Sequence, residues 1–93
     1  MNKTVKLSYV QNTDDVKDSF IAVFNDVKPR VIAKIRNAAW KNAKMKDIAC
    51  GSHVLFTTDM GISWSGWDED IETTETFANA IIEECKKLSI EVL

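Results

Sequence analysis

The chain of 93 residues is long enough for one folded domain and too short for two separate hydrophobic cores. Hydrophobic residues make up 45% of it and charged residues 28%, which is typical of a globular protein. No apolar run approaches the roughly 18 residues of a membrane span. We therefore expect a single domain over residues 1–93 that has no contact with a membrane.

Two features predict a cytoplasmic protein with reduced thiols. The first residues, Met1 to Thr4, lack the apolar stretch of a signal peptide. Cys50 and Cys85 are too few and too unpatterned to form a disulfide framework.

The first third of the chain predicts one strand and then helix. Alternating apolar and polar side chains over residues 4–10 indicate a half-buried strand. Apolar residues over 16–27 recur at helical spacing, behind aspartates that suit a helix N-terminus. Because proline is tolerated in a first turn, Pro29 favours a second helix, capped by Asp26 and running to about Lys46. A single helix kinked at Pro29 is the alternative.

The rest of the chain predicts a hairpin, a helix and a last strand. Residues 52–58 and 62–67 read as strands joined by the turn 59–61, in which the glycine is expected to supply a positive φ. A helix over 73–88 and a short strand over 89–93 follow. The order predicts an α+β, ferredoxin-like βαββαβ sandwich, whose antiparallel four-stranded sheet carries helices on one face.

The net charge of −2 conceals a strong division of charge along the chain. Residues 28–46 hold seven basic side chains and no acidic one, whereas residues 47–85 hold nine acidic side chains and no basic one. Electric fields of this kind steer encounters and select orientations. The division therefore indicates a protein that binds charged surfaces.

No pattern of catalytic or metal-binding residues accompanies this charge. Cys50 and His53 are close in sequence, but residues three apart in a strand point to opposite faces. The sequence has a single histidine, and its three glycines are dispersed rather than gathered in a phosphate-binding loop. We therefore expect no enzyme activity, no metal and no cofactor.

The leading hypothesis rests on the acidic segment that follows the predicted hairpin. Alternation places Trp64 in the core and Trp67 on the exposed face, beside three consecutive carboxylates. A tryptophan rimmed by charge is common at interface hot spots, although acids also suit a helix N-terminus. This favours a non-enzymatic protein-binding module that inhibits or adapts a larger, nucleic-acid-handling partner with a basic surface, in the manner of a phage anti-defence protein. Its contact residues would be Asp59, Trp67, Asp68, Glu69, Asp70 and Glu72.

The alternative hypothesis is nucleic-acid binding by the basic helix. Val31, Ile35, Ala38 and Met45 are expected to form its buried side. Trp40 falls almost opposite them, where its indole could stack on a base, or could instead cover a second apolar patch of the same helix. The nucleic-acid contacts would be Lys34, Arg36, Trp40, Lys41, Lys44 and Lys46.

A third hypothesis joins the two charged regions. The basic helix of one copy would dock on the acidic segment of a second copy, in a homodimer with two-fold symmetry.

Overall fold

The computed structural model describes residues 2–11, 18–45, 53–66 and 71–93. Along the chain the elements are β1 (Thr4–Gln11), β2 (Asp18–Asn25), α1 (Pro29–Asn42), β3 (His53–Thr57), β4 (Gly61–Gly66), α3 (Ile71–Lys87) and β5 (Glu91–Val92). The strands form one mixed sheet in the order β3-β4-β2-β1-β5, in which only β5 runs parallel to its neighbour. The α+β class is confirmed, but the order ββαββαβ is not the predicted βαββαβ of a ferredoxin-like fold.

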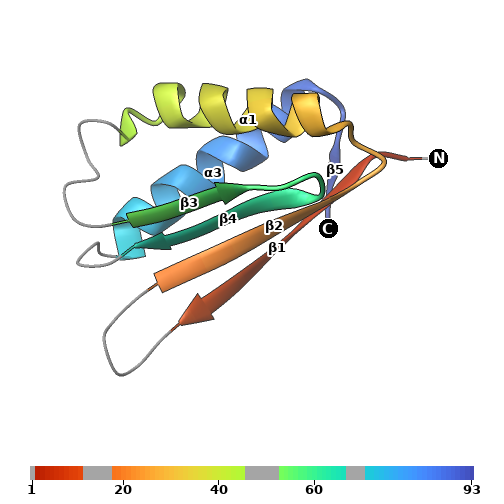
Figure 1. Ribbon diagram of the computed structural model, residues 1–93. Coiled ribbons are helices and arrows are strands. Elements are labelled where there is room, and N and C mark those ends of the chain that lie inside the picture. Colours follow the sequence, from red (N-terminus) through yellow and green to blue (C-terminus); the bar gives the residue numbers. More distant parts are fainter. Residues whose placement is uncertain (1, 12–17, 46–52, 67–70) are drawn as a thin grey trace.

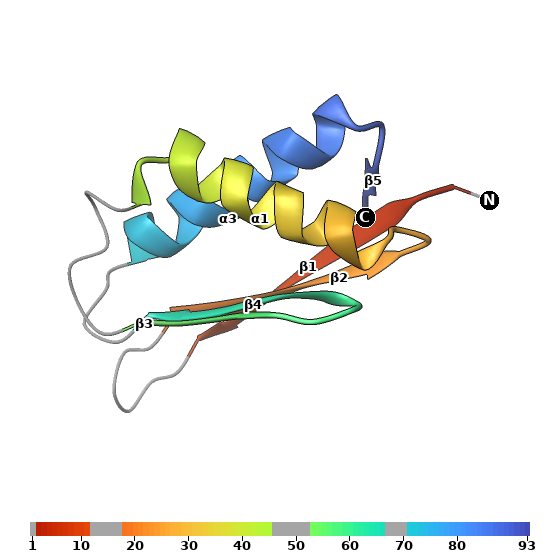
Figure 2. The same cartoon turned by 45° about the horizontal axis from the view of Figure 1, so that its top comes forward.

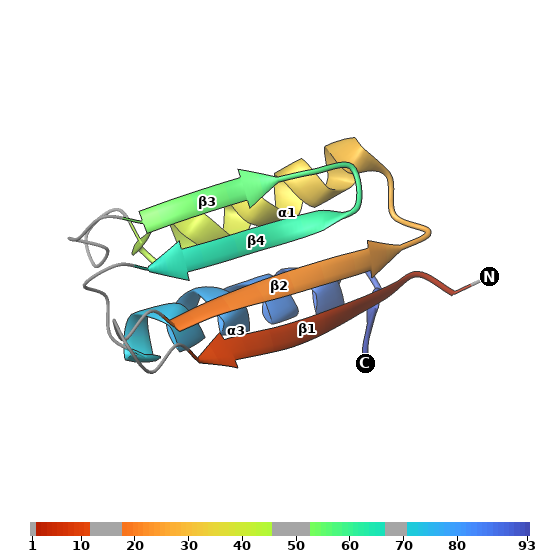
Figure 3. The ribbon, with the colours of Figure 1, turned by 60° about the horizontal axis from the view of Figure 1, so that its bottom comes forward.

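The two helices lie side by side on one face of the sheet, as predicted (Figures 1 and 2). Among the described residues, no element covers the opposite face, which Figure 3 shows from below. The domain therefore has two layers.

The largest departure from the predicted fold is β2, which occupies a region predicted to be helical. Phe20, Ala22 and Phe24 are buried, whereas Ile21 and Val23 between them are 44% and 46% exposed. This alternation is that of a strand, and all eight residues of β2 pair with β1. The helix prediction was wrong because both faces of β2 are apolar, so that residues three and four apart imitate a helical stripe.

The first helix is a separate element that begins at Pro29, in agreement with the predicted split. Proline loses nothing in the first turn, where its missing N–H would have no helical partner. The predicted cap was wrong: Asp26 has a left-handed backbone (φ 59°), and Lys28 holds the N-cap position with no side-chain hydrogen bond. The buried residues of the helix are Ile32, Ile35 and Ala39, and Met45 is buried beyond its end.

The predicted hairpin is formed by β3 and β4, but its glycine serves another purpose than the one expected. The Thr58 amide donates to the Gly61 carbonyl at 2.9 Å, and the Thr58 hydroxyl accepts the Gly61 amide at 3.0 Å. Gly61 does not have a positive φ. Its position requires glycine because a Cβ atom there would overlap the carbonyl oxygen of Ala22 on β2.

The core lies between the sheet and the helices and is built around aromatic rings. Trp64 is fully buried, as predicted, and its indole N–H donates to the Thr74 hydroxyl on α3 at 3.2 Å. The Phe77 ring lies 5.2 Å from the Trp64 ring and 5.8 Å from the Phe20 ring, centroid to centroid. The predicted helix over 73–88 and the predicted last strand correspond to α3 and β5.

Candidate binding surfaces

The described residues can be assessed for a metal site and for a reactive cysteine. No group of three or more His, Cys, Asp or Glu side chains lies close enough to hold a metal ion within this part of the chain. Cys85 is buried, and burial, together with nearby Glu84, raises the pKa of its thiol to about 11, so it is a poor nucleophile at neutral pH. Cys50 lies outside the described residues. No described helix has the length and the apolar character needed to cross a membrane.

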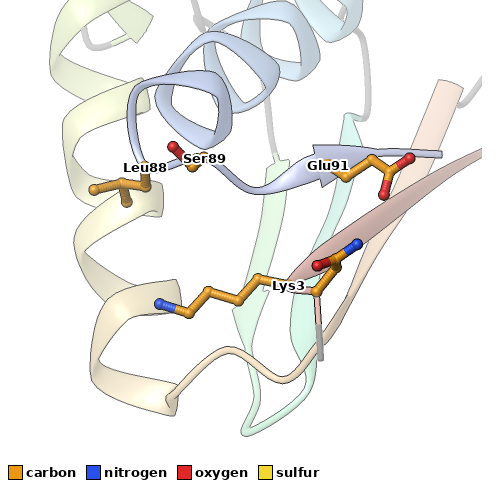
Figure 4. Close-up of a pocket in the computed structure, with 5 residues that line it drawn as sticks. Lys3, Leu88, Ser89 and Glu91 are labelled. Atoms are coloured by element: carbon orange, nitrogen blue, oxygen red, sulfur yellow. The ribbon is translucent and has the colours of Figure 1, made fainter.

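A hollow beside the two chain ends is open and has few converging polar groups. It measures about 430 Å³ and is lined by Asn2, Lys3, Leu88, Ser89 and Glu91. Figure 4 shows the Lys3 ammonium and the Glu91 carboxylate pointing away from each other. This divergence distinguishes it from a small-molecule site, in which a few polar groups are aimed at one ligand.

A first candidate surface is the cationic face of α1. Its residues are exposed and make no ion pair with any described residue: Lys28, Arg30, Lys34, Lys41 and Lys44. Three of them, Arg30, Lys34 and Lys41, lie within the helix, and Lys28 and Lys44 flank its ends. At 100° per residue, these three fall within about 40° of one another, opposite the buried side. The charge of this face is therefore directed away from the sheet, toward solvent.

Two residues of this helix that were predicted to contact nucleic acid, Arg36 and Trp40, do not lie on its cationic face. Arg36 is half-buried, donating to the Thr57 hydroxyl on β3 at 2.8 Å and to the Asn37 side-chain oxygen at 2.7 Å. Trp40 is half-buried too, with its ring 5.4 Å from Phe77 and 5.9 Å from Trp64. Trp40 is therefore not an exposed indole between two cations, and its ring covers apolar surface instead. Lys46 lies outside the described residues.

Near its C-terminus, the neighbouring helix α3 forms ion pairs within itself rather than with the cations of α1. Glu83 pairs with Lys86 at 3.5 Å and Glu84 with Lys87 at 2.9 Å, each within one turn. Between the two helices, the side-chain amide of Asn42 on α1 donates a hydrogen bond to the Glu84 carboxylate on α3 at 3.0 Å. This contact is not an ion pair, because the Asn42 side chain is neutral. The division of charge in the sequence thus persists between the described parts of the two helices.

The acidic site predicted from the sequence falls largely outside the described residues, which exclude Trp67, Asp68, Glu69 and Asp70. Asp59 is exposed in the turn between β3 and β4, and Glu72 is exposed in the first turn of α3. β4 runs the length of the sheet between them, so they lie at opposite ends of the domain (Figure 1). The structure does not bring these two carboxylates together.

A second candidate surface is the uncovered face of the sheet. Ile21 and Val23 of β2, with Met60 at 66% exposure, border a hollow of about 270 Å³. Its floor is β4, where Gly61 and Ser63 are small. Sequence reasoning missed this surface. The unbroken apolar run of residues 20–24 was a usable signal, because a strand that is apolar on both sides needs cover on both sides.

Comparison with known protein families, curated proteins and solved structures finds no match for this chain. Its function must therefore be argued from these surfaces.

Proposed function

We propose that this protein is a small non-enzymatic binding module, and that the cationic face of α1 binds the phosphate backbone of a nucleic acid. The observation that supports this most strongly is that three exposed cations share one face of α1 and two more flank its ends, with no ion pair to the described part of the chain. Lysine and arginine side chains held in this way displace condensed counterions from a nucleic acid, which is the main source of sequence-independent affinity.

The dimensions of the cationic face suit a short stretch of backbone. Arg30 and Lys41 are separated by eleven residues, which at 1.5 Å per residue is about 16 Å along the helix axis. One strand of a duplex carries about five phosphates over that length. The ligand would therefore contact only a few phosphates, and the affinity would be modest.

The position of Trp40 limits what such binding could read. Its ring packs on Trp64 and Phe77, so base stacking on this indole is not part of the proposal. Arg36 is likewise engaged with Thr57. We expect contacts with phosphates alone, which position a protein on nucleic acid without specifying a sequence.

The test is fluorescence anisotropy of labelled single- and double-stranded DNA and RNA, titrated with the protein at several salt concentrations. Binding should weaken steeply as salt rises. Lys34→Glu with Lys41→Glu should abolish it, because two contacts are lost and two repulsions are introduced. The matched control is Lys86→Glu with Lys87→Glu, which makes the same change in net charge on α3. Absence of binding at low salt, or an equal loss in the control, would contradict the proposal.

A protein partner with a basic surface is the second candidate, and the β3–β4 turn favours it. Asp59 is exposed there next to Met60, so a carboxylate stands beside an apolar anchor. The protein would then act as an inhibitor or adaptor. Charge reversal by Asp59→Lys should reduce the amount of such a partner that immobilised protein retains from cell extract, compared with wild type. Retention of the same proteins by both would count against this candidate.

A further inference from the structure

The uncovered face of the sheet has a ridge and a groove on adjacent strands. Ile21 and Val23 project from β2 and form the ridge. In the register, Ile21 pairs with Ser63 and Val23 with Gly61, so the small residues of β4 lie directly beside the ridge and leave the hollow. Thr58 and Met60 also line the hollow, and the Met60 carbonyl accepts from the Phe24 amide of β2. The ridge and the groove are thus about 5 Å apart, the spacing of neighbouring strands.

This arrangement is self-complementary under one symmetry operation. Consider a two-fold axis that runs parallel to the strands, midway between β2 and β4, in the plane where two open faces meet. Rotation about it places β2 of each copy over β4 of the other, so that each ridge enters the partner's groove. The strands of the two sheets then remain aligned, as they do in face-to-face packing of β-sandwiches.

The same rotation brings opposite charges together. Lys6 of β1 is exposed and pairs in register with Val23, which pairs in turn with Gly61. Thr58 is hydrogen-bonded to Gly61 at the other end of this row, and the exposed Asp59 follows it in the turn, so a cation lies at one end of the row and an anion next to the other end. Because the axis reverses the direction across the strands, Lys6 of each copy faces Asp59 of the other. An axis across the strands would place like charges together.

The area of this face is sufficient for a specific but weak association. Four strands about 4.8 Å apart, each contributing about six residues at 3.3 Å, give a face of about 400 Å² in projection. Counted over both copies, this is about 800 Å², which is in the range of weak, transient interfaces rather than of standard ones. Ile21, Val23 and Met60 supply its apolar centre.

We infer that the open sheet face is a homodimer interface, in which β2 of each copy packs into the groove over β4 of the other and Lys6 pairs with Asp59. This places both α1 helices on the outside of the dimer. The inference is independent of the proposed nucleic-acid binding, because the cationic face of α1 takes no part in the interface, but it competes with the second candidate function for Asp59 and Met60.

The experiment is sedimentation velocity of the full chain over about a hundredfold range of concentration, since dimer formation follows mass action. Wild-type protein should pass from monomer to dimer. Val23→Lys should raise the dimer dissociation constant at least about tenfold, because the lysine would lose hydration when the ridge enters the apolar groove of the other copy. Lys34→Glu on α1 is the control and should leave it unchanged. Circular dichroism checks that each variant is folded.

The charge pair is tested by exchange. Lys6→Glu and Asp59→Lys alone should each weaken the dimer about three- to tenfold, and K6E/D59K together should restore it, because the exchanged charges again face each other. A monomer at every concentration would overturn the inference, as would a dimer insensitive to Val23→Lys. Failure of the double variant to recover would overturn the two-fold arrangement. None of these outcomes depends on whether the protein binds nucleic acid.

Discussion

The two faces of β2 have similar apolar side chains but different surroundings. On the covered face, Phe20, Ala22 and Phe24 of β2 are buried beneath the helices with exposed fractions of 0%, 0% and 5%. On the open face of the same strand, Ile21 and Val23 remain almost half exposed. A sheet with one solvated face normally alternates between apolar and polar side chains. The lack of that alternation in β2 indicates that its second face is built to be covered.

The largest expected effect is on the covered face, at Trp64. Trp64→Ala removes a fully buried ring, its contact with Phe77 and the hydrogen bond to Thr74. The free energy of unfolding should fall by about 3–5 kcal/mol. Urea unfolding followed by circular dichroism measures it. A loss below about 1 kcal/mol, the range of exposed positions, would mean that the covered face is not the core of the fold.

A smaller loss of stability is expected where the hairpin approaches β2. Gly61→Ala places a Cβ against the carbonyl of Ala22, so β4 must shift away from β2. We expect the free energy of unfolding to fall by about 1–3 kcal/mol. Ser63→Ala, two residues along the same strand, is the control and should change it little. Equal values for the two variants would show that the close approach at Gly61 is not required.

How far the sequence predicts the fold depends on how many faces of an element are apolar. β1, the hairpin, α3 and Trp64 followed from one-sided patterns, in which the buried face is distinct from the exposed one. β2 did not, because apolar residues on both sides obscure the period of two and match the helical period equally well. The strand order then failed as a consequence, since the strand that replaces the first predicted helix, β2, is inserted between β1 and the hairpin.

The candidate surfaces show the same limit. The concentration of cations on and beside α1 was visible in the sequence, because no acid lies within residues 28–46. The position of Trp40 was not, since the angle of a side chain on a helical wheel does not reveal that Trp64 and Phe77 lie beside it. The groove over β4 depends on the register between β2 and β4, a long-range pairing that no local pattern specifies.

The burial of Cys85 on α3 should appear in the pH dependence of stability. Burial, and to a smaller extent Glu84, raises the pKa of this thiol from 9.0 to about 11. The unfolded chain therefore loses the proton first, and the free energy of unfolding should fall as pH rises from about 9 to 11. The raised pKa of Tyr9 acts in the same direction above its ordinary value of 10.0. Urea unfolding across this pH range, compared between wild type and Cys85→Ala, measures the contribution of the thiol. An unchanged slope would contradict the assignment.

The smallest effect on the monomer is expected on the open face, at Ile21. Ile21→Thr keeps a β-branched side chain in the strand and exposes less apolar surface, so the monomer should change by no more than about 0.5 kcal/mol. In the inferred dimer, Ile21 is buried in the interface. The melting temperature of the wild type should then rise with protein concentration, whereas that of the variant should not. Melting temperatures of the two proteins should coincide at low concentration and diverge at high concentration. Melting curves that coincide at every concentration would show that the open face stays in contact with solvent. Only the face of β2 that the helices cover would then be buried.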